Sequence, residues 1–322
     1  MKKVKTALIV LLLLSMVLSG CAGASEKPID RSNQNETDKG RMKIYASFYP
    51  MYFLASEIAG DKAEVISMVP AGAEPHDWEP SPRMVIELSK ADMLIYNGVG
   101  MEPWIDKILP NINSGKTKIV DASVGIELLK SEKHEEEEVQ NGEDHEHGIY
   151  DPHIWVSPKR AMQQAQTICQ AIVEIDPENS EYYRKNMAEL DSKLAKLDKD
   201  ISDASKSFKS NVIVVSHEAF GYFAKDYRLE QIAITGINPQ AEISSSKMIE
   251  LTRVCKEKNV EYIFFEKLTS PKLSETLAGE VGAGTLVLND AAGLNEEDIK
   301  SGKDYITVMY ENLENLKKAL GD

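Results

Sequence analysis

Three histidines stand in three separate segments of distinctive composition. His76 lies in the sequence PAGAEPHDWEP, His153 in DPHIWVSP and His217 in VIVVSHEAFGYF. They are 77 and 64 positions apart, so no single helix can hold them and only a folded chain can bring them together. Imidazole is a preferred ligand of zinc and of its neighbours in the first transition row. The three segments together therefore predict a transition-metal site.

Two acids are further candidates because they follow predicted strands. Glu266 comes directly after a predicted strand at Tyr262–Phe265, and Asp290 lies just past another at Thr285–Leu288. Ligands of open α/β sheets gather at the carboxyl ends of strands. Taken singly, such an aspartate can equally cap a helix or form a turn, and such a glutamate can pair with a cation. Their placement alongside the histidines favours a shared site in a cleft between two domains.

The elements that must position these residues alternate between strand and helix. Short apolar segments separated by helical patterns predict parallel sheets covered by helices, that is, an α/β fold. The expected strands of the first half are Lys43–Phe48, Ala63–Met68, Met93–Tyr96 and Lys118–Asp121. Those of the second half are Val212–Ser216, Gln231–Thr235, Tyr262–Phe265 and Thr285–Leu288.

A long helix is expected between the two halves. Residues 177–209 contain no glycine and no proline after Pro177, and apolar residues recur at spacings of three to five. About thirty residues at ~1.5 Å each would span ~45 Å, enough to bridge two domains. The alternative is two helices with a break near residues 200–203. We predict an N-terminal α/β domain at 42–176, a linking helix at 177–209 and a C-terminal α/β domain at 210–322.

The first forty residues predict export and anchoring. Residues 1–20 combine a basic start with an apolar run from Ala7 to Leu18, which is too short to span a bilayer and is typical of a signal peptide. The sequence Leu18-Ser19-Gly20-Cys21 resembles the lipobox of bacterial lipoproteins, which implies cleavage before Cys21 and lipid attachment to its thiol. An ordinary signal peptide or an uncleaved anchor is the alternative. Residues 21–41 would then be a lipidated cysteine and a flexible tether.

The net charge bears on the possible binding partners, and the cysteine content bears on disulfide formation. The net charge is −15, and loss of residues 1–20, with three lysines and no acids, changes it to −18. Nucleic acid is therefore excluded as an expected partner. Cys169 and Cys255 form no CxxC pair, so free thiols are expected, although a bridge between them stays open at this point.

From Ile44 to Leu320 the chain resembles the metal-binding solute-binding proteins of ABC transporters, specifically the zinc group. The segments that carry the resemblance are EPHDWEP around His76, DPHIW around His153, SHEAFGYF around His217, GINP with Glu242, and FFE ending at Glu266. The resemblance implies two α/β domains joined by one long backbone helix, with the metal in the interdomain cleft. It also implies a monomer, lipid-anchored outside the cytoplasm, that delivers Zn²⁺ to an ABC permease and is not an enzyme.

The resemblance also implies the ligand set. His76, His153 and His217 match the ligands of the family, and Asp290 is the nearest acid to the position of its fourth ligand. Zinc members often have a proline and shortly afterwards a glutamate before the next glycine, whereas this chain has Ala291-Ala292 before Gly293. Glu266 matches a family acid beside the site, which we interpret as a group that supports the ligands. The alternative fourth ligands are Glu266 itself and water. Manganese relatives place a glutamate where this chain has His217, and three imidazoles with one carboxylate suit Zn²⁺ better than Mn²⁺.

A second zinc signal is the segment 132–148, EKHEEEEVQNGEDHEHG. It contains His134, His145, His147 and eight acids, and zinc members carry a His- and acid-rich loop at this place. Such a segment could hold cations weakly as an accessory loop, or it could be merely a solvated acidic loop.

Three other functions use the same residues. A manganese receptor is the alternative within the family. A metal-dependent hydrolase would use three histidines and an open position on zinc, but the HExxH motif is absent, since Ala219, Phe220 and Gly221 follow Glu218. A zinc-binding adhesin would use the same metal site in a second role.

Imidazole ligation predicts a pH dependence, because protons compete with the metal for the same nitrogens. We expect the affinity for Zn²⁺ to fall as the pH is lowered from about 7.5 to about 5.5, which brackets the ordinary imidazole pKa. Titration against a competing chelator at several pH values measures this. An affinity that stays flat over that range would contradict imidazole ligation.

Overall fold

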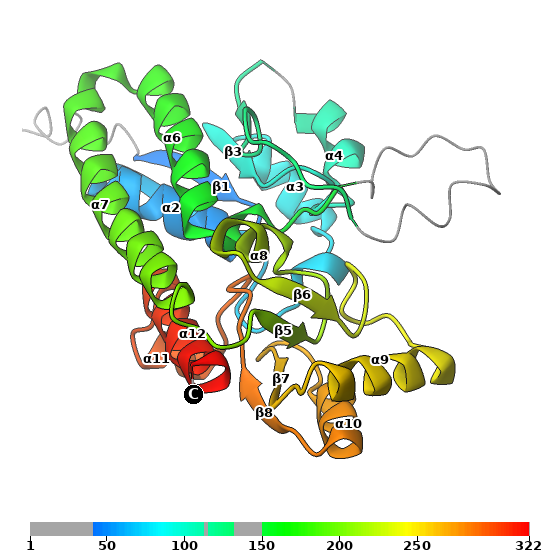
Figure 1. Ribbon diagram of the computed structural model, residues 1–322. Coiled ribbons are helices and arrows are strands. Elements are labelled where there is room, and N and C mark those ends of the chain that lie inside the picture. Colours follow the sequence, from blue (N-terminus) through cyan, green and yellow to red (C-terminus); the bar gives the residue numbers. More distant parts are fainter. Residues whose placement is uncertain (1–40, 113–114, 132–149, 322) are drawn as a thin grey trace, which may run out of the picture. The chain divides into compact units, whose positions relative to one another are not determined.

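Two four-stranded parallel sheets form the framework of the protein (Figure 1). The computed structural model describes residues 41–112, 115–131 and 150–321. The first sheet consists of β1 (Met42–Ala46), β2 (Ala63–Ser67), β3 (Met93–Tyr96) and β4 (Lys118–Asp121). The second consists of β5 (Val212–Val215), β6 (Glu230–Ala233), β7 (Tyr262–Phe265) and β8 (Gly284–Val287).

The two sheets have the same topology. Their strand orders are β2-β1-β3-β4 and β6-β5-β7-β8, and every pair is parallel. In the first sheet β2 lies on one side of β1, and β3 and β4 lie on the other side. The second sheet repeats this arrangement, with β6 on one side of β5 and with β7 and β8 on the other. The loops after β1 and β3, and after β5 and β7, leave the sheet on opposite sides at that point, where open α/β sheets form their binding crevices.

Each sheet has a hydrophobic core on its outer face. In the first half, α3 (Pro82–Leu88) and α4 (Ile105–Ile112) pack against the sheet through Leu88 and Ile108, among others. In the second half, α9 (Ser245–Glu257) and α10 (Lys272–Val281) contribute Leu251 and Leu277 to the equivalent core. Alternation of strand and helix along the chain produces this layering, because each crossover between parallel strands places a helix on the sheet.

A third core joins the two halves. Its helices are α2 (Tyr49–Ala59), α6 (Pro158–Ile175), α7 (Ser180–Ser205), α8 (Gly221–Tyr227) and α12 (Tyr305–Leu320). The long helix α7 packs against all the other four, and Leu190, Leu194, Leu197 and Ile201 form its buried stripe. Figure 1 shows α7 running along one side from the first half to the second. The two sheets are therefore tied by a continuous apolar core rather than by a flexible linker.

The fold class predicted from the sequence is confirmed. All eight strands occur within two residues of their predicted bounds, and α7 continues through residues 200–203 without the alternative break. The helix is shorter than predicted, because a 3-10 turn at Pro177–Asn179 precedes it and it ends at Ser205. The short helices α4 and α11 (Glu296–Lys300) were not predicted, because α4 contains an internal Pro110 and α11 has only five residues.

Several sequence predictions concern residues that the structure does not describe. Residues 1–40, with Cys21, and the segment 132–149, with His134, His145 and His147, lie outside the described residues.

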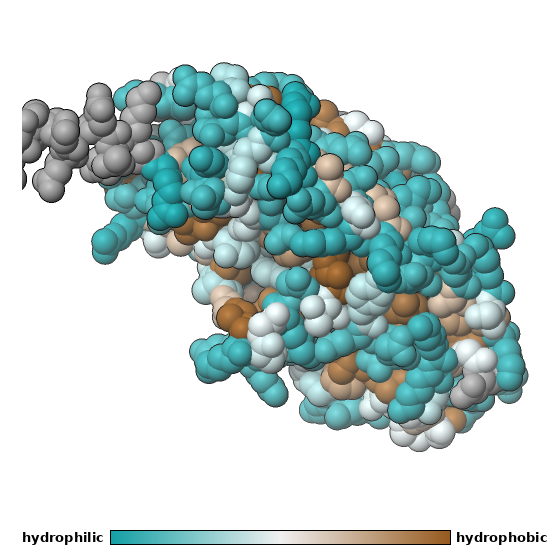
Figure 2. Space-filling model, turned by 90° about the vertical axis from the view of Figure 1, so that its left-hand side faces the viewer, coloured by the Kyte–Doolittle hydropathy of each residue, from teal (hydrophilic) through white to brown (hydrophobic). Residues whose placement is uncertain are grey.

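Cys169 and Cys255 are both buried and unbridged. Among the described helices, none combines the length and apolar composition needed to cross a membrane. On the face drawn in Figure 2, hydrophilic side chains cover most of the surface.

Candidate metal centre

The three histidines predicted from the sequence meet in one cluster. Nε2 of His153 lies 3.1 Å from Nε2 of His76 and 3.3 Å from Nε2 of His217. His153 and His217 are buried, with 0 % and 1 % exposure, and His76 is partly buried. A tetrahedral zinc site with Zn–N bonds of about 2.0–2.1 Å has an edge of about 3.3 Å between nitrogens. The spacing of the imidazoles around His153 is therefore that of a zinc coordination shell.

Two of the histidines come from a repeated local motif, acid-proline-histidine. In Glu74-Pro75-His76 the Glu74 carboxylate accepts from the backbone N–H of His76 at 3.2 Å. In Asp151-Pro152-His153 the Asp151 carboxylate accepts from the backbone N–H of His153 at 2.9 Å. His76 lies within the 3-10 turn Pro75–Asp77, and His153 directly precedes the 3-10 turn Ile154–Val156. The acid thus closes a tight turn that directs the imidazole, and the sequence analysis missed both acids although the shared spacing could have revealed them.

Asp151 also orients the ring of His153. Its Oδ1 lies 2.8 Å from Nδ1 of His153. When Nδ1 donates to this carboxylate, the lone pair of the ring is on Nε2, which faces the other two histidines. Burial raises the pKa of Asp151 to about 7, and hydrogen bonding from His153 opposes that shift.

Strand β5 ends at Val215 and is followed by Ser216 and His217, and Glu266 directly follows β7. Nδ1 of His217 lies 2.7 Å from Oε2 of Glu266, a close electrostatic contact that is not aligned as a hydrogen bond. Ser216 Oγ donates to the other oxygen of Glu266 at 2.6 Å. Both oxygens of Glu266 therefore have partners on the β5 segment, as expected of a group that supports a ligand.

Asp290 joins the same cluster from the loop after β8. It is buried, and His217, Glu266 and Asp290 offer ligand atoms that all lie within 4.8 Å of one another. Burial raises the pKa of Asp290, and the nearby Glu266 carboxylate raises it further. Asp290 Oδ1 accepts from the N–H of Ala292 at 3.1 Å. The structure therefore brings all five candidate residues predicted from the sequence, His76, His153, His217, Glu266 and Asp290, into one site.

A contact between the two halves fixes the Asp290 loop. Trp155, two residues after His153, donates from its indole Nε1 to the carbonyl of Asp290 at 2.8 Å. Tyr305, at the start of α12, donates in turn to the carbonyl of Trp155 at 2.6 Å. Both side chains are buried. Trp155 was quoted within the His153 segment but assigned no role, and its indole is what links the His153 turn to the Asp290 loop.

The charge states of the imidazoles differ. Burial lowers the pKa of His76 to about 2 and also lowers that of His153, and the neighbouring imidazoles add to both shifts. Burial acts in the same direction on His217, but the Glu266 carboxylate outweighs it and raises the pKa of His217 to about 9. Two rings are thus neutral at pH 7 and the third is protonated, with Glu74, Glu266 and Asp290 close by. A divalent cation would replace that proton and offset the surrounding carboxylates.

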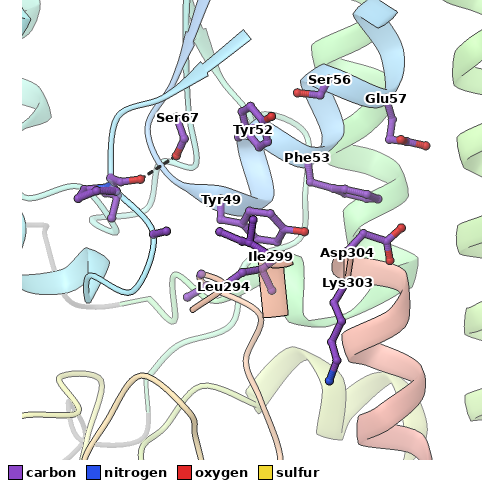
Figure 3. Close-up of a pocket in the computed structure, with 15 residues that line it drawn as sticks. Tyr49, Tyr52, Phe53, Ser56, Glu57, Ser67, Leu294, Ile299, Lys303 and Asp304 are labelled. Atoms are coloured by element: carbon purple, nitrogen blue, oxygen red, sulfur yellow. Dashed lines mark hydrogen bonds between the residues drawn. The ribbon is translucent and has the colours of Figure 1, made fainter. Parts of the chain in front are cut away.

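A cavity of about 540 Å³ lies close to this site but is separate from it. Figure 3 shows Tyr49 and Phe53 of α2 facing Leu294 and Asp304 of the segment after β8. None of the five candidate residues lines this cavity. Residues 69–71 and 292–294, which do line it, are near His76 and Asp290 in the sequence.

The protein belongs to a family of metal-uptake binding proteins. The family model for zinc-uptake complex component A, periplasmic, matches residues 44–319. The chain is similar to the high-affinity zinc uptake system protein ZnuA of Bacillus subtilis, with 38% identity over 305 residues that cover 95% of this chain and 94% of the relative. It is also similar to the zinc-binding lipoprotein AdcA of Streptococcus pneumoniae, with 39% identity, covering 89% of this chain and 57% of that protein.

A solved structure supports the same assignment. The crystal structure of the Zn(II)-bound ZnuA-like domain of Streptococcus pneumoniae AdcA is 36% identical, with a TM-score of 0.75, and the match covers 88% of this chain and 100% of that one. The chain therefore has the fold of this family over nearly all of its described residues. The resemblance inferred from the histidine segments is confirmed.

The contact between Glu266 and His217 generates a prediction about the metal-free protein. In Glu266→Gln the charge that raises the pKa of His217 is removed while burial remains. We expect the pKa of His217 to fall from about 9 to the ordinary imidazole value of about 6.5 or below. An NMR titration of the assigned His217 ring measures it, with Glu275→Gln on the exposed face of α10 as the matched control. An unchanged His217 pKa in Glu266→Gln would show that this contact does not exist in solution.

Proposed function

We propose that the protein binds Zn²⁺ outside the cytoplasm and delivers it to an ABC permease for zinc uptake. The observation that carries this proposal is the convergence of three imidazoles, with Nε2 of His153 at the spacing of a tetrahedral zinc shell from Nε2 of both His76 and His217. Membership of the zinc-uptake family and the zinc-binding names of its relatives support it. The captured ion is cargo, bound in one place and released to another protein.

We assign the ligands as His76, His153, His217 and Asp290. Glu266 supports His217 instead, because its two oxygens already contact His217 Nδ1 and Ser216 Oγ. Asp151 supports His153 in the same way. Each carboxylate beside a ring nitrogen fixes the ring and increases its basicity, which strengthens the bond to the metal. Three imidazoles and one carboxylate favour Zn²⁺ over the harder Mn²⁺, the cargo in the alternative proposal.

The attachment and the domain bounds are also proposals. We infer cleavage before Cys21, a lipid anchor on its thiol, and a flexible tether at residues 21–41, so that a monomer remains near the permease. Residues 42–176 and 210–322 would form the two domains, with 177–209 linking them; each range contains one of the two sheets. His134, His145 and His147 would form an accessory loop that holds cations weakly before they reach the cleft.

Catalysis is not part of the proposed function. The family is named as a component of an uptake complex. Glu218, the acid that a hydrolase would use as its base, accepts a hydrogen bond from Ser131 at 3.2 Å. Glu266 is engaged by two partners, so neither acid is well placed as a free general base for water. We therefore infer a receptor and not a hydrolase. A role as a zinc-binding adhesin would use the same site, and among the described residues no contact favours it specifically.

Competition between Zn²⁺ and Mn²⁺ tests the proposed function. We expect one equivalent of Zn²⁺ to bind in preference to Mn²⁺. His217→Ala should weaken zinc binding by more than the about 10- to 100-fold typical of losing an outer partner, because it removes a ligand itself. His145→Ala, which removes an imidazole from the segment 132–148, is the control and should leave the affinity of this site unchanged. Preference for Mn²⁺, or binding that is indifferent to His217, would contradict the assignment.

A further inference from the structure

Asp151 orients His153, yet Asp151 is itself held by the other half of the chain. Tyr222, the second residue of α8, donates its hydroxyl to the backbone carbonyl of Asp151 at 2.8 Å. The same hydroxyl accepts from the backbone N–H of Leu129 at 3.1 Å. Tyr222 is fully buried, and the Arg160 guanidinium lies over its ring at 4.7 Å. A tyrosine of the C-terminal half thus fixes the backbone on which the Asp151 carboxylate stands.

Gly221 makes room for the Asp151 side chain. A Cβ atom added at Gly221 would lie 2.4 Å from Oδ2 of Asp151, a distance that real Cβ contacts do not show. The other oxygen, Oδ1, contacts the backbone N–H and Nδ1 of His153. The carboxylate therefore fits between the first residue of α8 and the His153 ring, and it cannot move away from Gly221 without disturbing its bonds to His153.

The backbone conformation does not explain this glycine. Gly221 is not among the glycines with positive φ, and it begins a helix, where alanine is ordinarily the better residue. An alanine here should stabilise α8 slightly if only the helix mattered. Because an added Cβ would collide with the Asp151 carboxylate, we expect alanine to be unfavourable at this position instead.

The segment that holds Asp151 also carries a proposed ligand. His217 precedes Gly221 by four residues, and this stretch connects β5 directly to α8. We propose that Gly221 and Tyr222 are positioning residues that set the geometry of His153 through Asp151, so that one short segment of the C-terminal half determines the placement of two ligands. This inference rests on the proposed metal-binding function. It makes zinc affinity depend on the packing of α8 against the His153 turn.

Substitution of Gly221 tests the inference against a matched control. In the full chain, Gly221→Ala should displace the Asp151 carboxylate and weaken Zn²⁺ binding by about 10- to 100-fold, the usual effect of disturbing a partner of a metal-binding histidine. Gly279→Ala is the control, since a Cβ at this helical glycine of α10 meets no heavy atom within 4 Å. It should leave the affinity unchanged. Equal affinities of Gly221→Ala and Gly279→Ala would overturn the proposal.

A double-mutant cycle shows whether Gly221 acts through Asp151. In Asp151→Ala no carboxylate remains for an added Cβ to meet, so adding Gly221→Ala should change zinc affinity by less than about 2-fold. If Gly221→Ala instead causes the same loss with and without Asp151, it acts through α8 alone and the proposal is wrong. The visible spectrum of bound Co²⁺ provides a second measurement and should be altered in Gly221→Ala but not in Gly279→Ala.

Tyr222→Phe keeps the test decisive if Gly221→Ala fails to fold. It removes only the hydroxyl that bonds Asp151 and Leu129, and thermal unfolding of the metal-free protein checks that the fold is retained. We expect weaker zinc binding, because the backbone that carries the Asp151 carboxylate loses its bond to Tyr222. Unchanged affinity in a folded Tyr222→Phe would count against the proposal. If the wild-type protein binds no zinc, the proposed function is wrong and this inference with it. If the wild-type protein binds zinc and none of these substitutions changes the affinity, only this inference is wrong.

Discussion

The site depends on one constraint: to bind a single metal ion, three imidazoles whose Nε2 atoms converge must direct lone pairs, not protons, at a common point. Buried rings this close cannot all carry charge, and each ring needs its proton on the far nitrogen. Asp151 contacts that nitrogen of His153 at 2.8 Å, and Glu266 contacts that of His217 at 2.7 Å. These two carboxylates therefore determine both the orientation of the rings and the readiness of the cluster to accept a cation.

The repeated sheet topology explains how distant segments meet this constraint. The strand order of both sheets reverses at the same place, so the loops after β5 and β7 open a crevice that receives His217 and Glu266. The first half supplies His76 and His153 on tight turns closed by their own acids. The core around α7 holds the two halves together, and Trp155, Tyr305 and Tyr222 add polar contacts across the boundary. Both halves of the chain thus contribute residues to the site, and these contacts connect them.

Much of this arrangement could be predicted from the sequence, because it depends on local patterns. Buried parallel strands are short continuous apolar runs, so Val212–Val215 and Tyr262–Phe265 were identifiable, and the residues that follow them fall at the crevice. The role of Gly221 could not be predicted, because it arises from a contact with Asp151, 70 positions earlier in the chain. The resemblance already implied a supporting role for Glu266, and its contacts with Ser216 and His217 give the physical reason for that role. Local pattern identified the proposed ligands, whereas tertiary contacts decide which groups orient them.

X-ray absorption at the zinc edge of the loaded protein tests the central claim most directly, because it counts the nitrogen and oxygen neighbours of the ion. Our account predicts four-coordinate zinc with three imidazole nitrogens and one carboxylate oxygen at about 2.0–2.2 Å. Six-coordinate zinc, or a shell with fewer than three imidazoles, would contradict it. Such a result would mean that the converging histidines do not form the binding site together.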